Sequence, residues 1–454
     1  MMFKLVNFIL NCKLQNKSDI EFKNLIINSG FVFLFRLLGL IFGFILTFLI
    51  TKFYGTEILG IYTLSFTMLT VVAVLSRLGL DEALVKIVSG LMISGKKREV
   101  YLTYKFCFQT TFITAVILTI IFYLSSNFFS NLFDNKKLDS ALKIISLSIV
   151  PYALLKINSD LFKGMKETKY FSYFQTGSVF LLISIFIILF RILTLSSNVL
   201  FISIIVSSIF ILIISILIVN KFFNEPIKRD FNISKINLLK LSIPMMVTSS
   251  MFMVLSWTDN LLLGFFLKEQ NVGIYFVTYK ISLIISFGLF AVNSVISPKF
   301  SESYHKDDLM QLKKTAIYSA KLNFYLGLIL TTFLFFCIKF ILSIYGEEFK
   351  IAYRTFYILI IGQLFNTICG SVLNLLNMTG KEILVSLIIL SAAILNFTLN
   401  YYLIPIMESS KYFIGIEGAA LSSTICLIYW NVLGLFFVKK YYGFLMIPFL
   451  NKLK

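Results

Sequence analysis

Long apolar runs follow one another along this chain, and they constrain its fold more than any other feature. A helix needs about 20 successive apolar residues to cross a lipid bilayer, and about twelve runs of this kind occur here. Of the 454 residues, 58% are hydrophobic and 14% are charged, whereas soluble proteins carry roughly 25% charged residues. The sequence therefore predicts an all-α polytopic membrane protein with about twelve transmembrane helices.

The predicted helices are joined by short polar segments, which leave no room for a soluble catalytic domain. The runs are Ile26–Ile50, Ile58–Leu78, Phe106–Leu124, Ala141–Phe162, Phe171–Ile192, Val199–Val219, Leu241–Phe266, Val272–Ile296, Asn323–Leu342, Ala352–Leu376, Ile383–Ile404 and Ile416–Val438.

Basic residues in the joining segments predict the orientation. Most of the 41 Lys and Arg residues lie in alternate segments, for example Lys96, Lys97 and Arg98. Such segments stay on the cytoplasmic side of a membrane, so we expect both termini in the cytoplasm. The same bias explains most of the formal net charge of +19. Basic loops beside anionic membrane lipids account for this charge, and no nucleic-acid partner is expected.

A weak internal repeat predicts two six-helix bundles. Gly60-Ile61-Tyr62 recurs 213 residues later as Gly273-Ile274-Tyr275, and Lys86 matches Lys299 at the same offset. Two parallel repeats related by an axis along the membrane normal are a transporter arrangement. The expected units are a cytoplasmic N-terminal tail 1–25, an N-terminal bundle 26–219, a cytoplasmic linker 220–240, a C-terminal bundle 241–438 and a cytoplasmic C-terminal tail 439–454.

Two basic residues fall near the middle of predicted helices. At 1.5 Å per residue, Arg36 and Lys280 lie about 12–14 Å inside their helices. A basic side chain there is unfavourable by roughly 2.5–3.5 kcal/mol, so we expect each to face water, a counter-charge or an anionic ligand. Arg36 shares its helix face with Ser29, Gly43 and Thr47. Such a face suits the wall of a cavity, and it equally suits close helix packing.

The other basic residues of the apolar runs have simpler explanations. Lys143, Lys156 and Lys339 lie near helix ends, where a long side chain can extend its amine to the interface. Arg77 is followed by Asp81, and we retain it as a further candidate for ligand binding.

Motifs for catalysis, metal binding and disulfides are missing from the sequence. The five cysteines form no C-x-x-C pair, and the single histidine, His305, lies in the charged stretch SESYHKDD, where we expect a solvated loop. No phosphate-binding loop, nucleophile elbow or H-E-x-x-H motif occurs. We expect no catalytic residues, no metal and no cofactor, and a secondary-type transporter in place of an enzyme. Buried cations with few buried carboxylates favour an anionic cargo.

Several segments resemble a known family of membrane proteins. Tyr54–Ser89 (YGTEILGIYTLSFTMLTVVAVLSRLGLDEALVKIVS) is similar to the helix 2 region of polysaccharide-type flippases, and Ser242–Ser282 is similar to their helices 7 and 8. Gly346–Glu382, Leu395–Met407 and Gly415–Ser423 resemble their helix 10–12 region. These proteins belong to the multidrug/oligosaccharidyl-lipid/polysaccharide (MOP) exporter superfamily. Within it, the chain looks most like the Wzx-type O-antigen and capsule flippases.

This resemblance implies a function and a set of site residues. Such flippases move undecaprenyl-diphosphate-linked oligosaccharides across the bacterial inner membrane by alternating access, and they work beside polysaccharide polymerases and chain-length proteins. The stretch FRLLG around Arg36 is similar to an arginine motif of the related lipid II flippase, and YFVTYKIS places Lys280 at that protein's helix 8 arginine. Phe42 stands where the relative has a second arginine, a departure that argues against lipid II as the cargo. The resemblance thus implies that Arg36 and Lys280 hold a diphosphate in a cavity between the bundles.

Other readings of the sequence remain open. A multidrug or other small-molecule exporter of the same superfamily would use a buried carboxylate for a cationic drug, and Asp259, near the outer end of the seventh predicted helix, is the candidate. A membrane enzyme such as an O-antigen polymerase would be expected to have a larger external loop. A scaffold in the lipid would have no use for Arg36 and Lys280.

Overall fold

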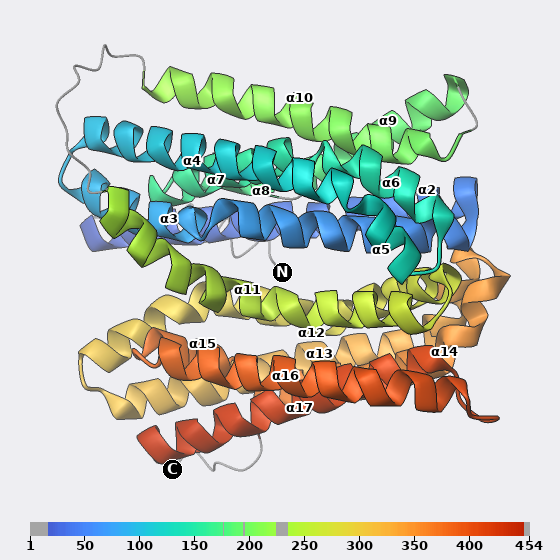
Figure 1. The fold of residues 1–454 in the computed structure, drawn as a ribbon. Helices are drawn as coiled ribbons and strands as arrows, with labels where there is room; N and C mark the ends of the chain where they lie inside the picture. The colour runs from blue at the N-terminus through green and yellow to red at the C-terminus, as the bar shows by residue number, and fades with distance from the viewer. Residues whose placement is uncertain (1–16, 176, 194–195, 224–234, 449–454) are drawn as a thin grey trace.

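The computed structural model describes residues 17–175, 177–193, 196–223 and 235–448. Helices make up almost all of this part, and no strand occurs among the described residues. Figure 1 shows the helices roughly side by side in two layers, one from blue to green and one from yellow-green to red. The layers correspond to the two halves of the sequence.

The first layer holds helices α2 to α10. They are α2 Lys17–Arg77, α3 Leu80–Ile93, α4 Lys97–Leu124, α5 Ser126–Leu132, α6 Lys136–Ser146, α7 Ile149–Gly164, α8 Thr168–Gln175, α9 Gly177–Leu193 and α10 Asn198–Phe222.

The second layer holds helices α11 to α17 and one 3-10 helix, η1. They are α11 Lys235–Phe266, α12 Glu269–His305, α13 Leu309–Tyr345, η1 Glu347–Ala352, α14 Tyr353–Cys369, α15 Val372–Met378, α16 Glu382–Glu408 and α17 Gly415–Tyr442.

The transmembrane spans agree with the predicted runs. Eight helices of the described part are long and apolar enough to cross a membrane, and the bent pairs α6–α7 and α8–α9 bring the number to ten. This number counts α2 as one span, although Gly55 divides it into two. It also leaves out the shorter apolar segment Met253–Phe266 of α11. All twelve predicted runs therefore fall on helices, and the predicted fold class is confirmed.

Gly55 turns the chain between the first two spans. Its φ of 85° and ψ of 176° interrupt the helical conformation of α2, and a residue with a side chain rarely adopts such a positive φ. At 1.5 Å per residue, the 44 residues Leu34–Arg77 would extend about 66 Å as one helix, about twice the hydrocarbon thickness. The turn at Gly55 sends the second part back across the membrane.

The outer surface of the helices is apolar, as a lipid-facing surface requires. On α13, Ile329, Phe336 and Phe340 are strongly exposed, and on α4 the same holds for Ile117 and Leu124. In water, an exposed apolar surface of this extent would promote aggregation. In a bilayer these side chains contact acyl chains.

Helices α2 and α12 make the main contact between the two layers, with further contacts between α3 and α11. Near the turn at Gly55 the two helices approach very closely. A Cβ atom at Gly60 would lie 1.8 Å from the carbonyl oxygen of Glu269, and one at Gly273 would lie 3.0 Å from the nitrogen of Gly60. Gly60 and Gly273 are equivalent positions of the sequence repeat, so the two repeats meet at this crossing.

The residues after these glycines are also arranged alike. Tyr62 stacks on Phe66 with ring centroids 5.6 Å apart, and Tyr275 stacks on Tyr279 at 5.9 Å. Both pairs are four residues apart, and they are related by the same 213-residue offset. The repeat therefore continues into the packing of the side chains.

The expected limits of the units differ from the observed helices. Lys17–Leu25 belongs to α2 and 439–442 belongs to α17, so both expected tails are partly helical. Helices α10 and α11 extend into the expected linker, while 1–16, 224–234 and 449–454 lie outside the described residues. His305, expected in a loop, is the last residue of α12. Its neighbours 299–304 lengthen this helix beyond the apolar run.

Candidate functional site

Arg36 lies on the part of α2 that faces α12. Its side chain is exposed, and the guanidinium carbon is 5.2 Å from the centre of the Phe290 ring on α12. Among the described residues no carboxylate forms an ion pair with it. A cation over an aromatic ring gains roughly 0.5–2 kcal/mol, which compensates the charge only in part.

Lys280 extends from α12 toward the same face of α2. Its ammonium donates a hydrogen bond to the carbonyl oxygen of Gly43 and lies 5.1 Å and 5.6 Å from the ring centres of Phe44 and Phe276. A Cβ atom at Gly43 would be 2.9 Å from the ammonium nitrogen. The absence of a side chain at Gly43 thus lets the cation reach the backbone of α2.

The structure therefore brings Arg36 and Lys280 to one seam, the contact between α2 and α12. Gly43, which carries the hydrogen bond of Lys280, is seven residues from Arg36, or about 10 Å along the helix. At Gly43 and Thr47 the small and polar face of α2 serves close packing: Thr47 lies 3.5 Å from the hydroxyl of Tyr345 on α13. The side chain of Ser29 lies outside the described part.

Arg77 is placed elsewhere, and its charge is neutralised. Its Nε atom is 2.8 Å from a carboxylate oxygen of Asp81, and both side chains are buried. The pair joins the end of α2 to the start of α3. Lys156 is similar, because its amine lies 3.0 Å from the fully buried carboxylate of Asp160. Lys339 lies over the ring of Tyr353 at 5.1 Å.

Asp259 on α11 is buried within the second layer, where its carboxylate accepts four hydrogen bonds. The donors are Tyr275 (2.8 Å), Asn400 (2.7 Å), Asn396 (3.1 Å) and Ser423. They belong to α12, α16 and α17. The amide oxygens of Asn396 and Asn400 are buried without a partner. A carboxylate and two free amide oxygens are the hard ligands that small cations take.

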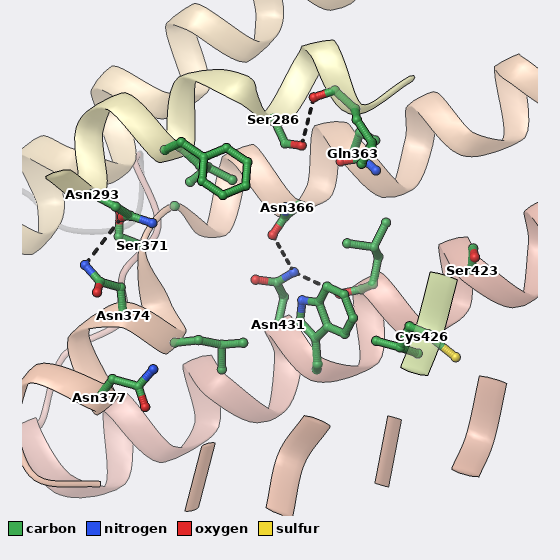
Figure 2. A pocket seen from close by; sticks show the side chains of 18 of the residues that line it. Ser286, Asn293, Gln363, Asn366, Ser371, Asn374, Asn377, Ser423, Cys426 and Asn431 are labelled. Carbon is green, nitrogen blue, oxygen red and sulfur yellow. Dashed lines mark hydrogen bonds between the residues drawn. The ribbon is translucent and has the colours of Figure 1, made fainter. Parts of the chain in front are cut away.

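A cavity lined by amide, hydroxyl and apolar side chains lies beside this cluster, within the second layer. It has a volume of about 530 Å³ and is bounded by α11, α12, α14, α15 and α17. Figure 2 shows Asn293 and Asn374 at one end, Asn366 and Asn431 in the middle, and Ser423 at the other end. Ser423 thus touches both the cavity and Asp259, and Phe290 forms part of the wall.

Charged residues inside the apolar runs did not predict this cavity, because none of them lines it. Its polar lining consists of amides and hydroxyls, which lie in the predicted runs 272–296, 352–376 and 416–438, apart from Asn377 just beyond the second of these. The available signal was the number of Asn and Gln residues inside apolar runs. Among the described residues, no group of three or more His, Cys, Asp or Glu side chains could hold a metal ion.

Solved membrane transporters share this fold. An inward-facing multidrug resistance MATE family transporter of the MOP superfamily is 11% identical with a TM-score of 0.69, and the match covers 89% of this chain and 94% of the other. The lipid II flippase MurJ in an inward closed conformation is 18% identical with a TM-score of 0.69, over 91% and 87% of the two chains. A Vibrio cholerae MATE transporter is 14% identical with a TM-score of 0.64, over 92% and 96%.

Sequence comparison gives the family. No curated protein matches the chain significantly. The MatE family model matches residues 244–402, and the model described as polysaccharide biosynthesis protein matches residues 23–304. The latter covers more than half of the chain and includes the α2–α12 seam. The protein is therefore a multi-pass membrane protein with a MOP superfamily fold, and it belongs to the polysaccharide biosynthesis protein family.

Proposed function

We propose that this chain is a flippase for an undecaprenyl-diphosphate-linked oligosaccharide, an O-antigen or capsule repeat unit, and that it moves this lipid across the bacterial inner membrane by alternating access. The observation that carries the proposal is the pair Arg36 and Lys280. Both are cations on the helices that join the two layers, and no carboxylate of the described residues neutralises either charge. An anionic ligand would supply the missing counter-charge.

A diphosphate suits this seam chemically. The planar guanidinium of Arg36 can bind two phosphate oxygens at once, whereas the ammonium of Lys280 acts as a point charge. Lys280 is already bonded to Gly43, so a ligand competes with one carbonyl group and two aromatic rings. The polyprenyl chain can stay in lipid while the polar head group crosses between the layers.

Arg77 and Asp259 have a supporting part in this proposal. The charge of Arg77 is neutralised by Asp81, and the carboxylate of Asp259 accepts four hydrogen bonds within the second layer. Both therefore need a conformational change before they could contact the cargo. We place the diphosphate at Arg36 and Lys280.

The proposed setting is the bacterial inner membrane, with both termini in the cytoplasm. Membrane lipids surround the helices, and a polysaccharide polymerase and chain-length proteins are the proposed partners at the outer face. The positive charge of alternate segments supports this orientation.

The test is a transport assay in proteoliposomes with lipid-linked oligosaccharide extracted from cells that lack this gene. Transport is measured as access of the glycan to a lectin that cannot cross the membrane. We expect the wild type to move the glycan, and Arg36→Ala to slow transport more than Arg36→Lys. Absence of transport by the wild type, or wild-type rates for both Arg36→Ala and Lys280→Ala, contradicts the proposal.

A second candidate is a multidrug or other small-molecule exporter of the same superfamily. Residues 244–402 match the MatE model, and this range contains Asp259, a buried carboxylate that could attract a cation. In this case, expression of the chain should raise resistance to cationic drugs, and Asp259→Asn should remove the resistance. The glycan-transport assay would then show no activity.

A further inference from the structure

The cavity in the second layer has an uncharged lining, in which six amide side chains stand among apolar and aromatic ones. Its amide side chains are Asn293, Gln363, Asn366, Asn374, Asn377 and Asn431, and no described residue that lines it carries a charge. Amide groups are costly to bury in a membrane protein unless they bind one another or a ligand. We propose that this cavity binds an uncharged sugar ring, the part of the cargo next to the diphosphate. This inference rests on the proposed function.

The lining does not suit the diphosphate or the polyprenyl chain of such a cargo, and it does not suit a cationic drug. A diphosphate needs cations and a drug cation needs a carboxylate, and neither lines the cavity. A polyprenyl chain would leave the buried amide oxygen of Gln363 without a partner. A sugar offers hydroxyl groups that both donate and accept, which matches amides with their separate donor and acceptor groups. The volume of about 530 Å³ falls in the usual range of ligand sites, about 300–1,000 Å³.

Gln363 on α14 is the strongest single indication of a ligand. The side chain is 2% exposed, and its Oε1 atom is buried without a hydrogen-bond partner. An unsatisfied buried acceptor costs about 1–3 kcal/mol. By contrast, Asn431 donates to Asn366 at 3.0 Å, and Asn374 donates to Ser297 at 2.9 Å. The free acceptor of Gln363 is therefore available for a sugar hydroxyl.

Aromatic side chains complete the lining. Trp430 on α17 and Tyr279 on α12 both line the cavity. The C–H face of a sugar ring packs well against an aromatic ring, because such rings combine a large apolar face with a polar edge. Amides and aromatic rings together form the kind of surface that recognises neutral carbohydrate.

The cavity lies beside the proposed phosphate site. Phe290 forms part of its wall, and the same ring carries the guanidinium of Arg36 at 5.2 Å. A diphosphate bound by Arg36 would therefore place its first sugar next to the cavity. The head group would lie across the seam, with its charge at α2 and its sugar within the second layer.

Two ligands distinguish the sugar site from the phosphate site. One is undecaprenyl diphosphate, and the other is the lipid-linked oligosaccharide extracted from cells that lack this gene. The chain has two tryptophans, and Trp257 donates a hydrogen bond to Thr70 outside the cavity. The variant Trp257→Phe therefore leaves Trp430 as the only tryptophan. We expect its emission to change with the oligosaccharide lipid and not with undecaprenyl diphosphate.

The binding test uses Gln363→Met and a matched control in the purified full-length protein. Because Oε1 has no partner, this change should not lower the melting temperature. It should weaken binding of the oligosaccharide lipid by roughly two- to tenfold, the effect of one hydrogen bond, and leave binding of undecaprenyl diphosphate unchanged. The control is Thr355→Val on the same helix. It removes a buried hydroxyl that likewise has no partner, away from the cavity, and should affect neither ligand.

The outcomes separate this inference from the proposed function. If the wild type binds both lipids, and Gln363→Met binds both as tightly as the wild type, the cavity is structural and the inference is wrong while the proposed function stands. An unchanged Trp430 emission with bound oligosaccharide lipid has the same meaning. If the wild type binds neither lipid, the proposed function fails, and the sugar site fails with it.

Discussion

The basic side chains inside the apolar helices differ in what neutralises them. Arg77 and Lys156 pair with Asp81 and Asp160, four residues further along the chain. Such a pair can be recognised in the sequence, because residues four apart share a helix face. Within the described part of the chain, Arg36 and Lys280 pair with no carboxylate and instead contact aromatic rings and a backbone carbonyl. Both lie at the contact between α2 and α12, two helices that are far apart in the sequence, so the sequence alone does not show that they come together.

Lys280 gives the sharpest prediction at the scale of single residues. Lys280→Arg should keep more surface polysaccharide than Lys280→Ala, and Lys280→Glu should keep least, because the proposed ligand is an anion. Loss of one charge-assisted contact removes about 1.5–3 kcal/mol, or roughly ten- to hundredfold in affinity. The measurement is complementation of a deletion strain, with the amount of each variant in the membrane determined in parallel.

The control for Lys280 is Lys339→Ala. The amine of Lys339 lies over the ring of Tyr353 near a helix end, so its removal should have little effect. Equal polysaccharide from Lys280→Ala and the wild type, at equal membrane levels, would show that Lys280 is structural.

Asp259 leads to a prediction about stability. A carboxylate accepts from all four of its donors, whereas the amide of Asp259→Asn would direct its NH₂ group at some of them. We expect the free energy of unfolding to fall by about 1–3 kcal/mol for each donor left without an acceptor, measured by thermal denaturation in detergent.

The control for Asp259 is Asp307→Asn. Asp307 is exposed and has a φ of 53°, a conformation that Asn accepts readily. The Asp307→Asn variant should therefore have the same melting temperature as the wild type. If Asp259→Asn is as stable as the wild type, the carboxyl group carries a proton in the folded protein and donates one of the four hydrogen bonds.

At the scale of elements, run length predicted the long helices well and the irregular ones poorly. All twelve runs fall mainly on helices, because lipid leaves the backbone no other partner for its hydrogen bonds. Three helical segments were expected as loops, because they lie outside the long apolar runs. They are α3, the seven-residue α5, and the extension of α12 to His305. The bend of 47° between α6 and α7 also has no signal in hydropathy.

The crossing of α2 and α12 predicts the effect of a single methyl group. Gly60→Ala should force the helices apart, because the Cβ atom would lie 1.8 Å from the Glu269 carbonyl oxygen. We expect lower thermal stability and reduced transport. Gly90→Ala on α3 is the matched control: it has open space around it, so the change should be neutral or stabilise by about 0.5–1 kcal/mol. If both variants behave alike, the close contact at Gly60 is not required.

At the scale of the whole molecule, the sequence repeat predicted two similar halves, and the matched packing of Tyr62 and Tyr275 agrees with it. The candidate site was predicted only in part. Charges inside the membrane identified Arg36 and Lys280, because an isolated charge stands out in an apolar run. The neutral cavity escaped prediction, because its amides come from four helices that only the folded chain brings together.

The predicted orientation can be tested in intact cells with single-cysteine variants made in a cysteine-free background. Lys97 is the first residue of α4 and Lys137 is the second residue of α6, and Figure 1 places the starts of these helices at opposite ends of the first layer. We expect an impermeant maleimide to label Lys137→Cys and to leave Lys97→Cys unlabelled until the cells are opened. If Lys97→Cys alone is labelled in intact cells, the topology is the inverse of the predicted one.

The contact between Gly60 and Gly273 has a consequence for how this chain can evolve. In a symmetric dimer, one gene encodes both sides of an isologous interface, so every substitution occurs twice. Here the two sides are equivalent positions of one chain and mutate independently. A larger residue at one glycine cannot be accommodated by a smaller residue at the other, because neither position has a side chain to lose. Each glycine therefore restricts which mutations the other half can accept, and the two positions are expected to stay small together in homologous chains.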